Sequence, residues 1–161
     1  MSQVKLSFED FVKGLAGYDL SFAQDLHEYM LNNGCKATFE EKKTRLLGSY
    51  KHTKTKKSVI NLLVKQHGLV VRIYGENLGG YRDFLNTLTP EMVQSIDDGS
   101  ACKRLVYNTC STKCSGYDFN IADKHYQKCR YNCFEFLVTR QCGSHIRTFV
   151  ETELNERQKQ L

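Results

Sequence analysis

The chain has little that would divide it into parts. Its 161 residues include a single proline, Pro90, and no low-complexity tract interrupts them. Nothing in the sequence therefore predicts a linker, an internal repeat or a second domain, and the length suffices for one domain with its own core. We expect one domain spanning residues 1–161.

Long apolar runs are also absent. No run approaches the roughly 20 residues that a membrane span requires. The first eleven residues carry Lys5, Glu9 and Asp10 instead of the apolar centre of a signal peptide. These features predict a soluble protein of the cytoplasm, where thiols are kept reduced.

Several catalytic motifs are missing. The chain lacks the H-x-E with P-C-x-x-C pattern of zinc deaminases, the C-x-x-C redox motif, the P-loop and the G-x-S-x-G elbow. A cysteine nucleophile such as Cys102, activated by a histidine, stays open because such partners meet in space rather than in sequence. The sequence favours a non-enzymatic protein.

Cysteine is what the chain does have. Five of its seven cysteines lie between Cys102 and Cys133, and four of them form two pairs with the same spacing, Cys110 with Cys114 and Cys129 with Cys133. Two matched pairs joined by a short loop are typical of a chain that surrounds one tetrahedral metal. We predict a metal site with these four thiolates, with Cys102 as a possible substitute ligand.

The spacing sets a condition on local structure. Bonds of about 2.3 Å to zinc place two ligating sulfurs roughly 3.8 Å apart, whereas an extended strand would separate residues i and i+4 by about 13 Å. The segment from Lys128 to Cys133 must therefore be a turn or a helical turn, and the same holds for the pair at Cys110. His125, four residues before Cys129, is left outside the ligand set.

A disulfide cluster and free buried cysteines are two other interpretations of this pattern. A disulfide cluster needs an oxidising compartment, and free buried cysteines have no reason to repeat a spacing. Four thiolates with no open position suit a structural zinc ion. An iron–sulfur cluster is the second choice, because the usual runs with two-residue gaps are absent.

The remaining pattern predicts an α+β fold in which helices cover one face of an antiparallel meander. Capping signals place helix starts at Ser7, at the capping box Ser21-Phe22-Ala23-Gln24, at Thr89 and at Ser144. A further helix is expected over Tyr81–Leu88, and fraying over 155–161. Strands are expected over Ala37–Glu41, Leu46–His52, Ser58–Lys65, Leu69–Tyr74 and Phe134–Val138.

Positive charge gathers in the first hairpins. Residues 36–57 contain eight basic side chains against two acidic ones, a net charge of +6 where the whole chain has +5. Such a cluster can bind phosphates, although clustered lysines more often form a solvated hairpin turn that resists aggregation. The cysteine segment 102–133 mixes basic and aromatic residues as well. We expect a nucleic acid or an acidic protein as partner, bound by Lys51, Lys54, Lys56 and Lys57.

Some stretches resemble a known group of proteins. Cys102-Lys103-Arg104-Leu105, Gly116-Tyr117-Asp118-Phe119 and the residues around Cys129 and Cys133 are similar to a family of small cysteine-rich bacterial α+β proteins of unassigned function. The resemblance implies no activity, ligand or catalytic residue. The order of helices and meander is also similar in layout to frataxin-like iron chaperones.

Two hypotheses of different kinds follow. In the first, the protein is a non-enzymatic binding module whose structural zinc fixes residues 102–133, while the sheet face or the basic hairpin meets an acidic or nucleic-acid partner. In the second, the thiols are a redox or metal-handling sensor that gains and loses its ion. A small-molecule ligand between sheet and helices is a third possibility that the sequence leaves open.

Overall fold

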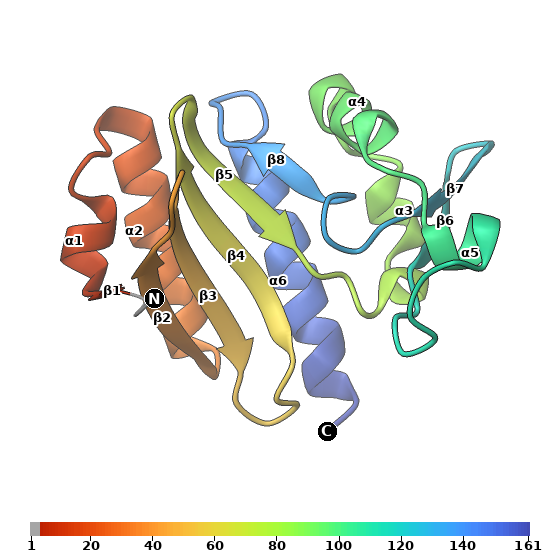
Figure 1. Ribbon diagram of the computed structural model, residues 1–161, viewed down its shortest axis with the longest axis horizontal. Coiled ribbons are helices and arrows are strands. Elements are labelled where there is room, and N and C mark those ends of the chain that lie inside the picture. Colours follow the sequence, from red (N-terminus) through yellow and green to blue (C-terminus); the bar gives the residue numbers. More distant parts are fainter. Residues whose placement is uncertain (1–3) are drawn as a thin grey trace.

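A six-stranded antiparallel sheet forms the centre of the computed structural model, which describes residues 4–161 (Figure 1). The strands lie side by side in the order β1-β2-β3-β4-β5-β8. Five of them follow one another directly in space as a meander, and β8 joins from the far end of the chain. Their bounds are β1 Val4–Leu6, β2 Cys35–Glu41, β3 Leu46–His52, β4 Ser58–Lys65, β5 Gly68–Ile73 and β8 Glu135–Leu137.

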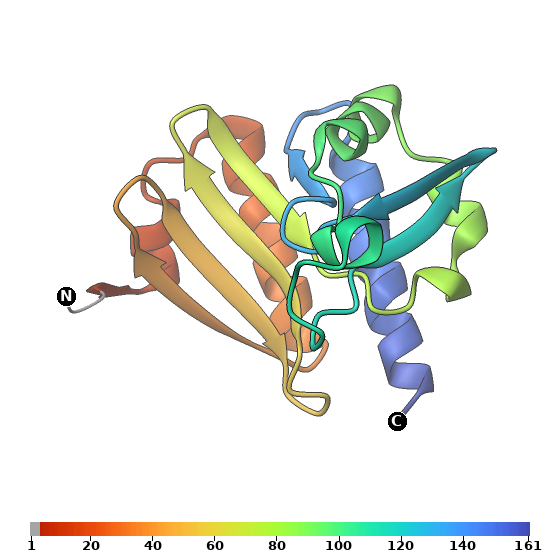
Figure 2. The ribbon, with the colours of Figure 1, turned by 45° about the vertical axis from the view of Figure 1, so that its right-hand side comes forward.

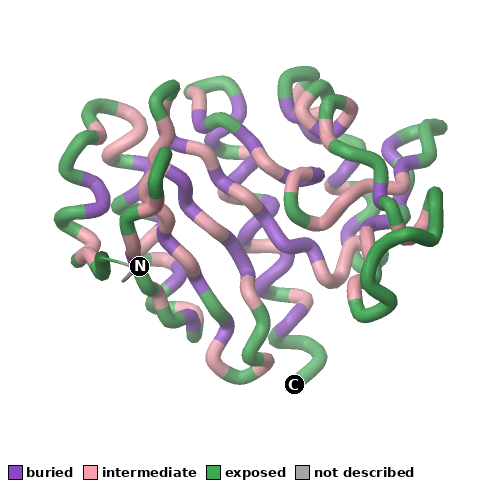
Figure 3. The backbone as a smooth tube through the Cα atoms, viewed as in Figure 1, coloured by how far each residue is buried: buried purple, intermediate pink, exposed green. Residues whose placement is uncertain are grey.

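The two faces of this sheet differ. Buried side chains alternate along β3 and β5, and Tyr50, Leu62 and Val71 are wholly enclosed on the inner face. Strand β4 is buried on both faces, since Leu63 next to Leu62 is also wholly enclosed. Helices α2 (Gly17–Asn32) and α6 (Gly143–Lys159) lie behind the sheet and cover this inner face (Figures 1 and 3). In the described part of the chain no helix lies over the opposite face, which we call the uncovered face. The predicted α+β architecture, with helices over one face of a meander, is confirmed.

Of the first two helices, α1 begins at the predicted cap and α2 does not. Helix α1 (Phe8–Val12) begins where Ser7 was expected to cap it, because the Ser7 hydroxyl accepts a hydrogen bond from the Asp10 amide. Helix α2 begins at Gly17, four residues before the predicted capping box, so that interpretation is wrong. The additional turn packs Tyr18 near Phe22, with 6.2 Å between their ring centroids.

Short helices connect the sheet to the cysteine segment. In α4 (Pro90–Asp98) the predicted cap is confirmed, since Thr89 accepts from the Met92 amide over 3.2 Å and Pro90 occupies the first turn. The helix expected over Tyr81–Leu88 shrinks to α3 (Arg82–Leu85), which follows the 3-10 turn η1 (Leu78–Gly80). The cysteine segment contains α5 (Lys103–Tyr107), β6 (Tyr117–Ile121) and β7 (Lys124–Lys128), and it projects beside the sheet (Figure 2).

The last helix is longer than expected. Ile146, Phe149, Val150 and Leu154 face the core as predicted. The expected fraying over 155–161 is wrong, because Arg157 is only 3 % exposed and its guanidinium donates to the carbonyl oxygens of Ser58 and Tyr74 at 2.9 and 3.0 Å. These distant contacts carry the helix to Lys159.

Candidate metal centre and basic surface

The cysteine segment is built on a two-stranded hairpin. Tyr117, Phe119 and Ile121 alternate with exposed residues along β6, and Tyr126 faces them from β7. The rings of Phe119 and Tyr126 are stacked with centroids 5.2 Å apart. This alternation with a period of two is an ordinary strand signal. No strands were predicted here, because the prediction for this segment was based on its cysteines.

One cysteine of each pair lies close to the same end of this hairpin. Tyr117 pairs with Lys128 at that end of the ladder. Cys114 precedes β6 by three residues, and Cys129 directly follows β7. The fold therefore places Cys114 and Cys129, fifteen residues apart in the sequence, next to two paired strand ends.

A tight turn lies at each pair, although the first turn begins at Ser111, after Cys110. The Cys133 amide donates to the Cys129 carbonyl oxygen over 3.0 Å, closing one helical turn. The Cys114 amide donates to the Ser111 carbonyl oxygen over 3.2 Å. The prediction of a turn between Lys128 and Cys133 is confirmed for residues 130–133 and wrong for Lys128, which ends β7.

Cys102 joins the same end of the hairpin. Ala101 forms an antiparallel bridge with Lys128, and the amides of Cys102 and Cys129 donate to Gln127 and Ser100 at 3.0 and 2.9 Å. The Cys102 sulfur also touches the backbone at Gly116, where an added Cβ would lie 2.4 Å from it. Cys102 is thus next to both cysteine-bearing turns.

The five thiols differ in access. Cys102 and Cys133 are buried, Cys114 and Cys129 are half-buried, and Cys110 is exposed. Burial raises the pKa of the Cys133 thiol well above its usual range, against the opposing charge of Lys128. Among residues 4–161, no group of three or more His, Cys, Asp or Glu side chains is arranged to hold a metal ion. The four-thiolate site, its fourth ligand and its zinc all stay predictions.

Arg130 anchors the segment to the sheet. Its guanidinium binds the Glu76 carboxylate and lies between the rings of Tyr74 and Tyr117, 6.0 and 5.5 Å from their centroids. Burial opposes ionisation of Glu76, but the hydrogen bond and charge of Arg130, with Arg157 and Lys57, lower its pKa. Tyr117 also accepts a 2.9 Å hydrogen bond from the Gly75 amide.

The single histidine of the segment is engaged elsewhere. His125 Nε2 lies 2.5 Å from Asp118 Oδ1, and Gln127 donates to the other oxygen of the same carboxylate. Both His125 and Asp118 are exposed, and Asp118 is one ladder position from the Tyr117–Lys128 pair next to the cysteines.

The predicted partner-binding lysines lie at one end of the uncovered face. Lys51 is in β3, and Lys54, Lys56 and Lys57 are in the turn to β4, all exposed. His52 closes this turn, because its amide donates to the Lys57 carbonyl oxygen over 2.9 Å. None of the four ammonium groups lies within ion-pair distance of a carboxylate in residues 4–161.

A surface cleft of about 320 Å³ lies between α2 and α6. Its lining is polar, and Arg147 stands 4.4 Å from the ring centroid of Tyr29 within it. Small-molecule sites are mostly apolar, so this cleft gives no support to the small-molecule alternative.

Two findings concern the chain as a whole. Neither α2 nor α6 nor any other helix in the described residues has the apolar length that a membrane crossing needs. Comparison with protein-family models, with curated proteins and with solved structures gives no match. The resemblance to a family of small bacterial proteins therefore stays a prediction.

Proposed function

We propose that the protein is a non-enzymatic binding module whose cysteine segment is held by one structural zinc ion. Cys114, Cys129 and Cys133 would supply three thiolates, and Cys102 is the best-placed fourth. The observation that supports this proposal is the position of three cysteines next to residues paired at one end of the β6–β7 hairpin: Cys114 precedes Tyr117, Cys129 follows Lys128, and Cys102 follows Ala101, which bridges to Lys128. A cytoplasmic location, which keeps thiols reduced, belongs to the same proposal.

The choice of fourth ligand rests on contacts. Cys102 is buried against Gly116 and bonded through its backbone to β7. Cys110, the symmetric candidate from the spacing, is exposed at the start of the loop to β6. Cys102 therefore supports a closed site better, with Cys110 as the alternative.

The chemistry of such a site explains why we propose no reaction. Four thiolates fill the tetrahedral coordination of zinc and leave no position for an activated water. The ion would contribute folding free energy instead, on the order of 10 kcal/mol for a structural site. Its effect would reach the sheet through Arg130, which follows Cys129 directly and binds Glu76.

Elemental analysis of the native protein tests the proposal. We expect one zinc per chain, lost in Cys114→Ser, Cys129→Ser, Cys133→Ser and Cys102→Ser. The matched variants Cys35→Ser and Cys142→Ser, which alter buried cysteines outside the segment, should keep the ion. If Cys102→Ser keeps the zinc and Cys110→Ser loses it, the fourth ligand is Cys110 and not Cys102. A metal-free native protein that cannot be loaded with zinc would refute the proposal.

A thiol sensor is the second candidate, favoured by the exposure of Cys110. An exposed thiol four residues from a ligand can form a disulfide with it, as two thiols give two protons and two electrons to a peroxide. Mild peroxide should then release zinc from wild type but not from Cys110→Ser, and a dithiol should restore binding. Equal zinc release from both proteins would count against the sensor.

A further inference from the structure

Two lysines on the uncovered face are direct cross-strand neighbours. Lys36 of β2 pairs with Lys51 of β3, and both are exposed, whereas Cys35 and His52 form the adjacent buried pair. Like charges directly opposite one another destabilise a sheet. The fold therefore tolerates a repulsion here that an anionic partner would relieve.

The same charge continues into the neighbouring turn. Lys54, Lys56 and Lys57 project from the link between β3 and β4, where Lys56 has the left-handed backbone φ of +63°. Within residues 4–161, none of these three ammonium groups, nor those of Lys36 and Lys51, forms an ion pair. Glu76 is the acid whose pKa responds to Lys57, and its carboxylate is already bound by Arg130.

An exposed aromatic ring lies at the same end of the sheet. Tyr131 is 60 % exposed and meets Tyr74 edge-on, with centroids 6.5 Å apart. The Tyr74 amide donates to the Val59 carbonyl oxygen, which places the Tyr74 backbone beside the start of β4, where the lysine turn ends. Arg130, beside Tyr131, is fixed by Glu76 and by the rings of Tyr74 and Tyr117.

We propose that this basic surface, formed by Lys36, Lys51, Lys54, Lys56, Lys57 and Tyr131, binds single-stranded nucleic acid. The lysines neutralise backbone phosphates, and Tyr131 offers its free face to an unpaired base. In a duplex the base faces are stacked on one another and cannot stack on Tyr131, and an acidic peptide contains no bases. The exposed ring therefore favours a single strand over both of these partners. The proposal names the partner of the proposed binding module. It rests on the proposed zinc site only because the turn 129–133, which that site would fix, carries Tyr131.

Fluorescence anisotropy with a short labelled single-stranded oligonucleotide of mixed sequence tests the proposal. Five neutralised phosphates predict a slope of about −3.5 in log affinity against log salt, or about a 100-fold loss between about 50 and 200 mM. The double variant Lys51→Gln/Lys54→Gln should lower the magnitude of the slope by about 1.4. The control Lys13→Gln/Lys43→Gln removes the same charge from exposed lysines after α1 and in the β2–β3 turn, outside the surface, and should bind like wild type.

The ring has its own test. Tyr131→Ala should weaken binding about five-fold or more with an unchanged salt slope, and Tyr131→Phe should restore it. Tyr107→Ala removes an equally exposed tyrosine from α5 and should bind like wild type. An affinity for polyglutamate or duplex equal to that for the single strand would overturn the proposal, as would equal losses in the control variants. Zinc content measured on every variant separates a failed surface from a failed metal site.

Discussion

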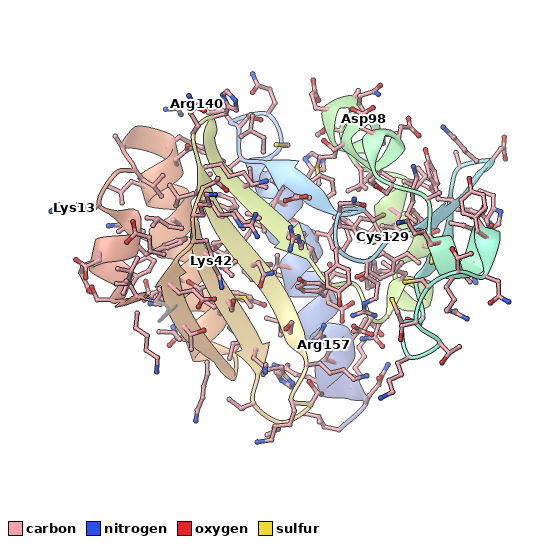
Figure 4. All side chains as sticks on the ribbon, viewed as in Figure 1. Lys13, Lys42, Asp98, Cys129, Arg140 and Arg157 are labelled. Atoms are coloured by element: carbon pink, nitrogen blue, oxygen red, sulfur yellow. The ribbon has the colours of Figure 1, made fainter. Side chains whose placement is uncertain are left out.

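Arg157, labelled in Figure 4, donates a 2.7 Å hydrogen bond from Nε to Glu153 Oε2 inside the protein, and both side chains are at most 3 % exposed. The same carboxylate accepts from the hydroxyl of Tyr81 at 2.7 Å and from the backbone and side-chain nitrogens of Asn77. The guanidinium meanwhile donates to three backbone carbonyl oxygens. This pair thus ties the C-terminal helix to the lysine turn and to the chain after β5.

Loss of Arg157 should be costly. We expect Arg157→Leu to lower the free energy of unfolding by about 3 to 5 kcal/mol, because it strands the buried charge of Glu153. For a chain of this size the melting temperature should fall by about 6 to 20 °C. Urea unfolding and thermal scans of wild type and variant measure both quantities.

The control is an exposed pair on the same helix. Lys159 binds Glu156 over 3.0 Å with its side chain 70 % exposed, and Lys159→Leu should change stability by less than about 1 kcal/mol. Comparable losses in the two variants would show that the buried pair contributes no more than a surface one.

The contacts of Arg157 also explain why the C-terminal end of α6 was not predicted from the sequence. The strands Leu46–His52 and Ser58–Lys65 were predicted with the observed bounds, because local runs of β-favouring residues end at polar turns. The polar tail after Leu154 gave no such signal. Its order depends on Arg157 reaching carbonyl groups about a hundred residues earlier in the chain, and local sequence does not encode that contact.

Gly116 provides a test of the cysteine segment that needs no metal measurement. Its backbone φ is +65°, and an added Cβ would lie 2.4 Å from the Cys102 sulfur. Gly116→Ala should therefore destabilise the protein by about 2 to 4 kcal/mol, combining left-handed backbone strain with overpacking. At Gly79 an added Cβ meets nothing within 4 Å, so Gly79→Ala is the matched control. Equal thermal stability of the two variants would contradict this packing of Cys102.

The candidate site, too, was predictable only where its structure depends on residues that are close together in the sequence. Equal spacing of two cysteine pairs correctly required turns at both, since i to i+4 geometry is local. The hairpin that brings the turns to one end, and the bridge that adds Cys102, depend on pairing between Tyr117 and Lys128 and between Ala101 and Lys128. Such pairings are set by the tertiary fold.

His27 should make stability depend on pH. Its ring stacks on Phe8 with centroids 3.8 Å apart, and Nδ1 lies 2.7 Å from the Tyr50 hydroxyl. Burial lowers the pKa of His27, against the opposing charge of Glu9. Burial also lowers the pKa of His52, assisted by Arg157 and Lys54.

The sign of the effect follows from these shifts. The unfolded chain protonates at a higher pH than the folded one, so stability falls as the pH drops below about 6.5. Urea midpoints between about pH 7 and pH 5.5 should decline in wild type and decline less in His27→Gln. His67→Gln alters an exposed histidine in the β4–β5 turn and should follow wild type. A midpoint that rises with acid would contradict the assignment.

Thiol reactivity should distinguish the cysteines individually. Burial raises the pKa of Cys35 to about 11, partly offset by Arg157, so only about one molecule in a thousand carries its reactive thiolate at pH 8. Cys110 is exposed, and in the proposed site it is not a ligand. Native protein should therefore show one fast-reacting thiol with Ellman's reagent, and Cys110→Ser should abolish that phase while Cys35→Ser keeps it. Absence of a fast phase in native protein, with its appearance on chelation, would instead make Cys110 the fourth ligand.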